Sequence, residues 1–317
     1  MSIIETKKLT KTFTKSSFSW SGFKFEREVN TAVDKVDLQI EEGEFVGFLG
    51  PNGAGKTTVL KMLSGIIYPT SGEARVMGYD PFLKNYDFLK QIGLVMGQKN
   101  QLWWDLSASD SYDLLKEIYD LDQITFKKNL AEMVEVLGMQ KLLRKTIRNM
   151  SLGERMKCEI VAALIHQPKI LFLDEPTIGL DIISAQAIRN FLIRTNEEKK
   201  CTIILTSHYM VDVETLCKRI IIINHGKKIY DGNLVKLRAK YAPEKRIEIF
   251  LPTVADKEKF AQLKVAKKLW EGRGIISISK EKLGPMVKEV FDLFPAENIL
   301  VSDPETEEVI GKIFNQK

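Results

Sequence analysis

The chain has 317 residues, of which 44% are hydrophobic and 28% charged, and its formal net charge is +5. This composition is typical of a globular protein with plenty of core, and the length favours one large and one small domain. No apolar run reaches the ~18 residues that a membrane span needs, and the N-terminus has no apolar signal segment, so we expect a chain in the cytoplasm. The weak positive charge gives no reason to expect nucleic acid as a partner.

The N-terminal residues predict two strands around an unusual segment. Residues 3–13 predict a strand that ends at Phe13, and residues 31–40 predict a second strand. The aromatic, basic and Ser-rich residues 15–30 interrupt them. We interpret this segment as a long hairpin loop folded onto the domain. The alternative is a contact for a partner or a membrane surface, because exposed aromatic residues beside basic ones often mark such contacts.

A phosphate-binding loop follows a buried strand. The apolar residues Phe45 to Leu49 predict the strand, and a helix is predicted from Thr57 to Leu63. The residues between them fit the pattern G-x-x-x-x-G-K-[ST], whose glycines let backbone N–H groups face a phosphate at a helix N-terminus. Lys56 can reach the β- and γ-phosphates of a nucleoside triphosphate, and Thr57 can hold Mg²⁺. The expected nucleotide-binding residues are Gly50, Pro51, Asn52, Gly53, Ala54, Gly55, Lys56, Thr57 and Thr58.

The middle of the chain predicts a change from strands to helices. Residues 92–96 predict a short strand, and Gln98 follows it, where its amide can touch Mg²⁺ or water. Residues 106–149 have apolar side chains at helical spacing and predict a helical insert, with Trp103 and Trp104 at its entrance.

A helix is predicted to begin at Ser151. Ser151 and Glu154 fit the capping box S-x-x-E, which leaves the serine hydroxyl available to a phosphate at the helix N-terminus. Taken alone, the same pattern also describes an ordinary, well-capped helix.

Two carboxylates and a histidine follow later strands. Residues 169–173 predict a buried strand, after which Asp174 can hold Mg²⁺ and Glu175 can act as the general base toward an attacking water. Residues 201–206 predict another strand, and His208 after it can contact a γ-phosphate or orient the water. Strands alternating with helices predict an α/β fold with a mainly parallel sheet covered on both faces.

A smaller second domain is predicted after Lys240. Residues 241–245 look like a linker, and residues 246–301 predict the order βαββαβ, which is the ferredoxin-like arrangement. This region has no histidine or cysteine, so we expect no active site there. We expect it to hold two copies of the chain together, and a ligand-sensing module is the alternative.

The order of these segments resembles the ATP-binding-cassette (ABC) ATPases over about residues 3–240. The signature, usually Leu-Ser-Gly-Gly-Gln, departs from that pattern because it reads Met150-Ser151-Leu152-Gly153-Glu154. Gly97 is an apparent extra residue in the Q-loop, so Gln101 is the alternative to Gln98. The matching segments are residues 50–57 (Walker A), Gln98 (Q-loop), Ser151 and Gly153 (signature), Ile170 to Glu175 (Walker B), Gly179 to Asp181 (D-loop) and His208 (H-loop).

The resemblance implies a P-loop NTPase domain at residues 1–240, with an antiparallel β subdomain and a helical insert at about residues 99–165, followed by the small α/β domain at 241–317. It implies ATP and Mg²⁺ as cofactors. In such a site Phe13 stacks on the nucleotide, Thr57, Gln98 and Asp174 hold the metal, and Glu175 and His208 take part in hydrolysis with Gln98. Ser151 and Gly153 act on the nucleotide of a second copy, and Asp181 also belongs to the nucleotide site.

The resemblance also implies a partner in the membrane. The sequence from Gln98 to Asp105 resembles that of the ATPases of export-type systems, whose permeases are separate chains. We therefore expect a peripheral subunit at the cytoplasmic face of the cell membrane that couples ATP-driven closure of its dimer to export. The alternatives are a soluble ABC ATPase of translation or DNA repair and a nucleotide-gated interaction module with little hydrolysis.

Overall fold

The computed structural model describes residues 2–19, 24–97, 100–263, 265 and 267–315. The chain divides into two compact units, Met1–Gly232 and Asn233–Lys317. This boundary comes earlier than the expected one at Lys240, because the helix α8 (Leu234–Tyr241) belongs to the second unit. The linker expected at residues 241–245 is instead the end of α8 and the start of β10 (Glu244–Phe250).

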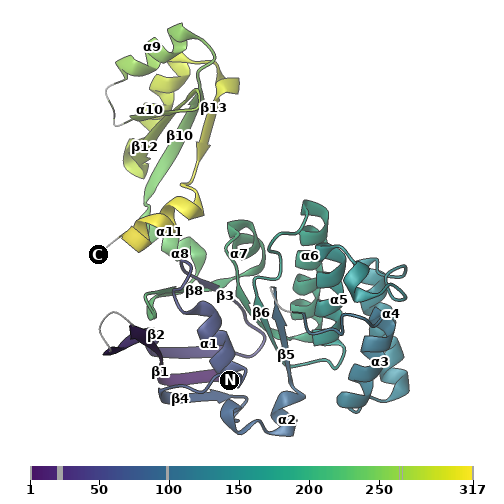
Figure 1. Ribbon diagram of the computed structural model, residues 1–317. Helices are drawn as coiled ribbons and strands as arrows, with labels where there is room; N and C mark the ends of the chain where they lie inside the picture. Colours follow the sequence, from purple (N-terminus) through teal and green to yellow (C-terminus); the bar gives the residue numbers. More distant parts are fainter. Residues whose placement is uncertain (1, 20–23, 98–99, 264, 266, 316–317) are drawn as a thin grey trace. The chain divides into compact units, whose positions relative to one another are not determined.

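The first unit is built on a six-stranded sheet with the order β5-β6-β7-β3-β8-β9 (Figure 1). All neighbouring pairs are parallel except β8 and β9. Every residue of β3 and β7 is buried, which explains why these strands are continuous apolar runs and not alternating ones. The strands are β3 (Phe45–Leu49), β5 (Ile92–Met96), β6 (Ile170–Asp174), β7 (Thr202–Thr206), β8 (Arg219–Asn224) and β9 (Lys227–Gly232).

A three-stranded antiparallel sheet with the order β2-β1-β4 forms the β subdomain. Its strands are β1 (Ser2–Ser19), β2 (Lys24–Glu41) and β4 (Ser71–Val76). The expected loop at residues 15–30 is wrong, because β1 and β2 stay paired up to Ser19 and Lys24. The serines favoured a loop, but Phe18 and Trp20 are two residues apart in the sequence, as are Phe23 and Phe25, and this spacing is a strand pattern.

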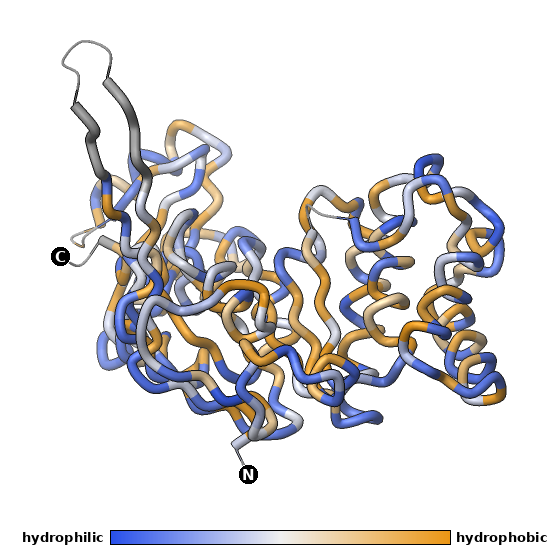
Figure 2. The backbone as a smooth tube through the Cα atoms, turned by 60° about the horizontal axis from the view of Figure 1, so that its bottom comes forward, coloured by the Kyte–Doolittle hydropathy of each residue, from blue (hydrophilic) through white to orange (hydrophobic). Residues whose placement is uncertain are grey.

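Helices occupy the expected insert and lie beyond the core sheet (Figure 1). The insert contains α3 (Ala108–Ile118) and α4 (Gln123–Leu137), and α5 (Leu152–Leu164) packs between them and the sheet. Ser107 and Asp122 cap the first two helices by accepting backbone N–H bonds. Hydrophobic residues gather on the core strands, whereas α3 and α4 mix both kinds (Figure 2). The remaining helices are α1 (Lys56–Leu63), α2 (Tyr86–Leu89), α6 (Ile182–Lys199) and α7 (Met210–Leu216).

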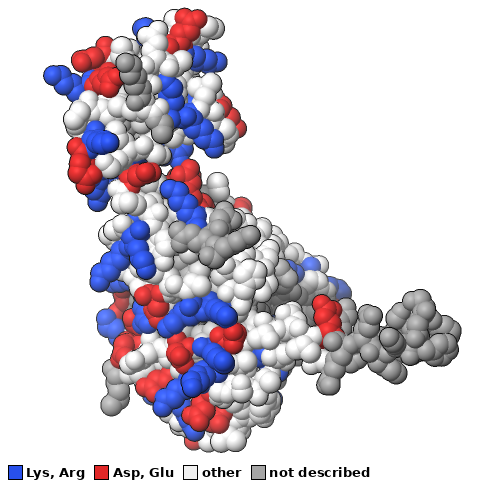
Figure 3. Space-filling model, turned by 90° about the vertical axis from the view of Figure 1, so that its left-hand side faces the viewer, with Lys and Arg blue, Asp and Glu red and all other residues white. Residues whose placement is uncertain are grey.

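The second unit has the ferredoxin-like fold that the sequence predicts. Its antiparallel sheet has the order β11-β12-β10-β13, in which β10 lies between the last strand and the third. Its own core contains Ile247, Ile249, Ile276 and Val290. Basic and acidic side chains are interspersed on the face of this unit in view in Figure 3. Its other elements are α9 (Val254–Gln262), β11 (Lys267–Trp270), β12 (Arg273–Ser279), α10 (Lys280–Leu293), β13 (Ile299–Ser302) and α11 (Thr306–Asn315).

Candidate nucleotide-binding and hydrolysis site

The phosphate loop joins the carboxyl end of β3 to the first residue of α1. Gly50 and Gly55 have φ angles of 156° and 108°, and a Cβ at either position would come within 2.1 Å and 2.2 Å of a backbone oxygen. The loop can therefore take this tight path only with glycine at both positions. The helix start and the loop N–H groups form the kind of concave, partly positive surface that binds phosphate.

Lys56 lies across this loop. Its Nζ donates to the carbonyl oxygens of Gly50 at 2.6 Å and Pro51 at 3.0 Å, and the residue is 5% exposed. Burial lowers the pKa of the Lys56 ammonium, and the nearby carboxylates of Glu175 and Asp174 oppose that shift. The charge of Lys56 is therefore held beside the loop and close to both Walker B carboxylates.

Asp174 connects the phosphate loop to the neighbouring strand. Its Oδ1 and Oδ2 accept from Thr57 Oγ1 at 2.9 and 3.0 Å, and Oδ1 also accepts from Thr206 Oγ1 at 2.6 Å. Asp174 pairs with Thr206 across β6 and β7, so the sheet register fixes this arrangement. A carboxylate and a hydroxyl side by side are suitable oxygen ligands for Mg²⁺, which usually takes few protein ligands besides water and substrate phosphates. No group of three His, Cys, Asp or Glu side chains that could hold a metal ion occurs in the described part of the chain.

Glu175 and His208 meet at the ends of β6 and β7. Glu175 Oε1 lies 2.5 Å from His208 Nε2, and the two line a small cavity of about 130 Å³. The Glu175 N–H donates to the carbonyl oxygen of Thr206 at 3.0 Å, and Glu175 has a positive φ of 56°. A left-handed backbone at a residue other than glycine is costly, and such residues cluster at functional sites. The cavity beside this pair has room for a water in contact with the carboxylate and the imidazole.

The buried carboxylate of Asp212, which the sequence analysis missed, links the two segments that carry Glu175 and His208. Asp212 is fully buried, and its Oδ2 accepts from Thr177 Oγ1 at 2.5 Å and from Ser207 Oγ at 2.7 Å. Its Oδ1 accepts from Arg189 Nε at 2.6 Å. Thr177 comes shortly after Glu175, and Ser207 directly precedes His208, so Asp212 ties the two segments together. Its signal in the sequence is an acidic residue inside an apolar run, between Val211 and Val213.

The signature helix α5 begins with the capping box that the sequence predicts. Glu154 N donates to Ser151 Oγ at 3.2 Å, and Ser151 N donates to Glu154 Oε2 at 2.8 Å. Ser151 Oγ acts there as an acceptor, so its own proton is free for another partner. A Cβ at Gly153 would lie 2.5 Å from Ser184 Oγ and 3.4 Å from Asp181 Oδ2. The signature and Asp181, which caps α6 through the Ser184 N–H, therefore lie together.

Among the described residues, no hydrogen bond joins Ser151 or Asp181 to the phosphate loop.

The Q-loop is described only in part, because Gln98 lies outside the described residues. The alternative is Gln101, whose side-chain amide donates to the carbonyl oxygen of Leu94. The backbone N–H of Gln101 donates to Glu159 Oε1 at 3.0 Å. Gly97, which looked like an extra residue, donates its N–H to Asp174 O at 2.7 Å, and a Cβ there would lie 2.4 Å from Glu175 O. Glycine at this position lets the Q-loop start directly against Walker B.

Phe13 lies on β1, 42% exposed, with Lys11 Nζ 5.2 Å from its ring centroid. An exposed ring beside a cation suits stacking on a base near phosphates.

Comparisons with known proteins agree with this geometry. The sequence profile of the ABC transporter family matches residues 33–178. The chain is 35% identical over 229 residues to the ABC transporter ATP-binding protein NatA of Bacillus subtilis, covering 72% of this chain and 93% of NatA. It is 33% identical to the bacitracin transport ATP-binding protein BcrA of Bacillus licheniformis over 66% of this chain and 68% of BcrA.

A solved structure of the ATP-binding cassette MJ0796, a dimer in a post-hydrolysis state bound to ADP and Pi, superimposes with a TM-score of 0.62 at 26% identity. The superposition covers 73% of this chain and 98% of that cassette. Because the family profile, NatA and the fold agree, the chain belongs to the ABC transporter family and is one of its ATPase subunits.

Proposed function

We propose that this chain powers an export-type ABC transporter whose permease is made of separate membrane chains. The observation that carries the proposal is the cluster at the carboxyl ends of β3, β6 and β7, where Lys56, Thr57, Asp174, Glu175 and His208 meet. That cluster supports ATP hydrolysis. A transport role is supported by the name of the relative BcrA, a bacitracin transport protein, and export by the resemblance of residues 98–105 to export-type ATPases.

We propose the following roles for the residues around ATP. The phosphate loop and Lys56 bind the β- and γ-phosphates, and Thr57, Asp174 and Gln98 hold Mg²⁺, which would neutralise phosphate charge. Glu175 takes a proton from the attacking water, and His208, at 2.5 Å, orients that water and the γ-phosphate. The Phe13 ring stacks on the base. Ser151, Gly153 and Asp181 of one copy complete the site of a second copy.

The proposed permease contact lies at Trp103 and Trp104, where the chain enters the helical insert. The two residues are 39% and 46% exposed, which supports a surface that a permease can reach. The Arg155 guanidinium lies 5.4 Å from the Trp104 ring centroid, and buried Glu159 accepts the N–H of Leu102 at 3.2 Å. Both partners lie on α5, so a force on the tryptophans would reach the signature helix.

The membrane location follows from this contact. No helix in the described part of the chain is long and apolar enough to cross a membrane. We propose that the chain is a peripheral subunit at the cytoplasmic face of the cell membrane, held there by the permease.

Co-purification with a membrane protein tests this proposal. We expect the tagged full chain, extracted in mild detergent, to retain an integral membrane protein. We expect Trp103→Ala/Trp104→Ala to lose that protein and to keep ATP binding. The control is Ile124→Ala, which removes an 82% exposed apolar side chain from α4. If the wild type brings down no membrane protein, a soluble ABC ATPase or a nucleotide-gated interaction module is the better account.

We also propose that the second unit helps to hold two copies together. The sheet face opposite its core exposes Phe250, Trp270 and Leu300 by 51%, 53% and 56%. The register places these residues on one face, since Phe250 and Trp270 both pair with Arg273 and Leu300 pairs with Glu248. A face that has apolar residues and charges of both signs can match a second copy of itself.

A further inference from the structure

The first unit has a cavity of about 600 Å³ at the edge of the core sheet opposite the nucleotide site. It is lined by Lys169 and Cys201, which directly precede β6 and β7, and by Glu42, shortly before β3. The phosphate loop and Walker B lie at the other, carboxyl ends of these parallel strands. The cavity is therefore separate from the ATP site, and its volume is typical of a pocket for a small organic molecule.

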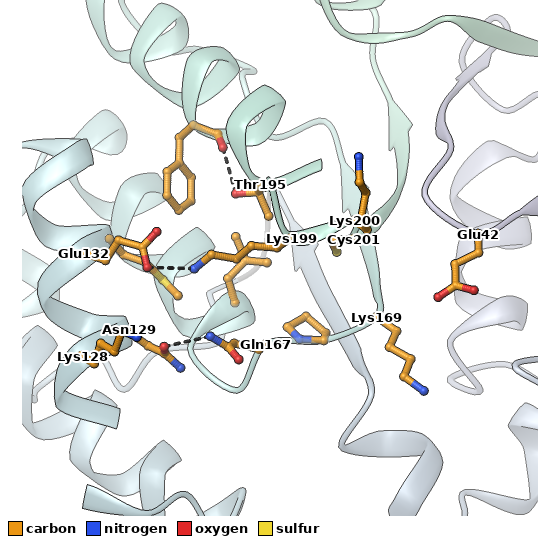
Figure 4. A pocket seen from close by; sticks show the side chains of 14 residues that line it. Glu42, Lys128, Asn129, Glu132, Gln167, Lys169, Thr195, Lys199, Lys200 and Cys201 are labelled. Atoms are coloured by element: carbon orange, nitrogen blue, oxygen red, sulfur yellow. Dashed lines mark hydrogen bonds and ion pairs between the residues drawn. The ribbon is translucent and has the colours of Figure 1, made fainter. Parts of the chain in front are cut away.

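Two walls of this cavity come from different parts of the fold (Figure 4). One wall is α4 of the helical insert, and the other is α6 of the core. The Glu132–Lys199 ion pair joins them at 3.1 Å. The buried Asn129 amide of α4 is held on the first wall, because its oxygen accepts from Gln167 at 2.8 Å and its nitrogen donates to Ile165 O at 3.3 Å.

The lining of the cavity combines an apolar floor with an excess of positive charge. Met133, Leu164 and Phe191 are buried apolar side chains on the floor. Lys128, Lys169, Lys199 and Lys200 line the rim, against only the two carboxylates Glu42 and Glu132. Glu132 is engaged by Lys199. Among the described residues, the ammonium groups of Lys128, Lys169 and Lys200 have no hydrogen bond or ion pair, so positive charge remains for a ligand.

We propose that this cavity binds a small organic anion, with its apolar body on the floor and its acidic group toward the lysines of the rim. Two features of the site, the lysines and the apolar floor, support this class of ligand. An uncharged ligand would gain nothing from the lysines, and a purely inorganic anion would leave the apolar floor in contact with water. A ligand bound here contacts both α4 and α6, so it couples the helical insert to the core from the side opposite ATP.

The test uses the anionic fluorescent probe 1-anilinonaphthalene-8-sulfonate on the full chain. Saturating MgADP occupies the nucleotide site during the titration. We expect one tight binding phase, and we expect Lys128→Glu/Lys200→Glu to weaken it about tenfold or more, because two positive charges of the rim are reversed. The matched control is Lys127→Glu/Lys141→Glu, which makes the same charge change at exposed lysines outside the cavity. The uncharged probe N-phenyl-1-naphthylamine should bind the wild type much more weakly.

The reverse results would overturn the proposal. These are equal weakening by both pairs of substitutions, no weakening by either, or equal binding of the charged and uncharged probes. Thermal unfolding of both variants checks that they are folded. If Lys128→Glu/Lys200→Glu is not, Lys128→Gln/Lys200→Gln takes its place, with an expected weakening of about threefold.

Discussion

Arg189→Met is the substitution that most directly tests how the hydrolysis segments are held. It keeps the apolar stem of the side chain and removes the charge that pairs with Asp212 at 2.6 Å. The Asp212 side chain has no exposed surface, so it would stay buried as a carboxylate with only two neutral hydroxyl donors, Thr177 and Ser207. Breaking a buried ion pair from one side costs about 3–5 kcal/mol of unfolding free energy. In a unit of this size, that lowers the melting temperature by roughly 6–20 °C.

The matched control is Arg194→Met on the same helix. Arg194 pairs with Glu198 at 2.8 Å, but both side chains are about half exposed, so the loss should be within about 1 kcal/mol. Scanning calorimetry of the full chain measures both variants. We expect Arg189→Met also to lower ATP turnover, because Ser207 positions the neighbouring His208. If the two variants melt within about 2 °C of each other, the reasoning about the buried network is refuted.

Three further predictions concern separate parts of the chain. Lys56→Ala should weaken ATP binding by about tenfold or more in a direct titration, because it removes a charge-assisted contact to the phosphates; equal affinity would contradict its role. Burial lowers the pKa of His166 from 6.5 to about 4, so the unfolded chain takes up the proton first as the pH falls. The folded state should thus lose about 2 kcal/mol between pH 7 and pH 5 relative to a His166→Gln variant, measured by urea unfolding at both pH values, and parallel losses would count against this. A chain cut after Gly232 should still bind ATP but self-associate more weakly without nucleotide in sedimentation, and unchanged association would remove the dimer role of the second unit.

Local sequence signals predict the buried strands and the phosphate loop well. β3 and β5 have the bounds that the sequence predicts, Phe45–Leu49 and Ile92–Met96, because both are short apolar runs bounded by turn residues. The phosphate loop is equally local, since its glycines are required by close backbone contacts at Gly50 and Gly55. Such features depend on residues near one another in the chain, which is what a sequence pattern records.

Other features depend on distant partners and were not predicted. The Asp212–Arg189 pair joins α7 to α6, and the sequence of either helix alone does not indicate which residue of the other helix it contacts. The reason for glycine at position 97 is visible only in the structure, because a side chain there would meet the backbone of Glu175, just after β6. Helix α8 was missed although Asn233 caps it, because it is short and has few apolar positions.

The measurement that tests the central claim most directly is the hydrolysis rate of Glu175→Gln. The claim is that Glu175, next to His208 at 2.5 Å, removes the proton from the attacking water. The substitution keeps the size of the side chain and leaves Lys56, Thr57 and Asp174 in place, so ATP should bind with wild-type affinity. In a single-turnover assay of phosphate release by the full chain, we expect the rate to fall by about 100-fold or more. A rate within about threefold of the wild type, with ATP bound equally well, would show that Glu175 is not the base.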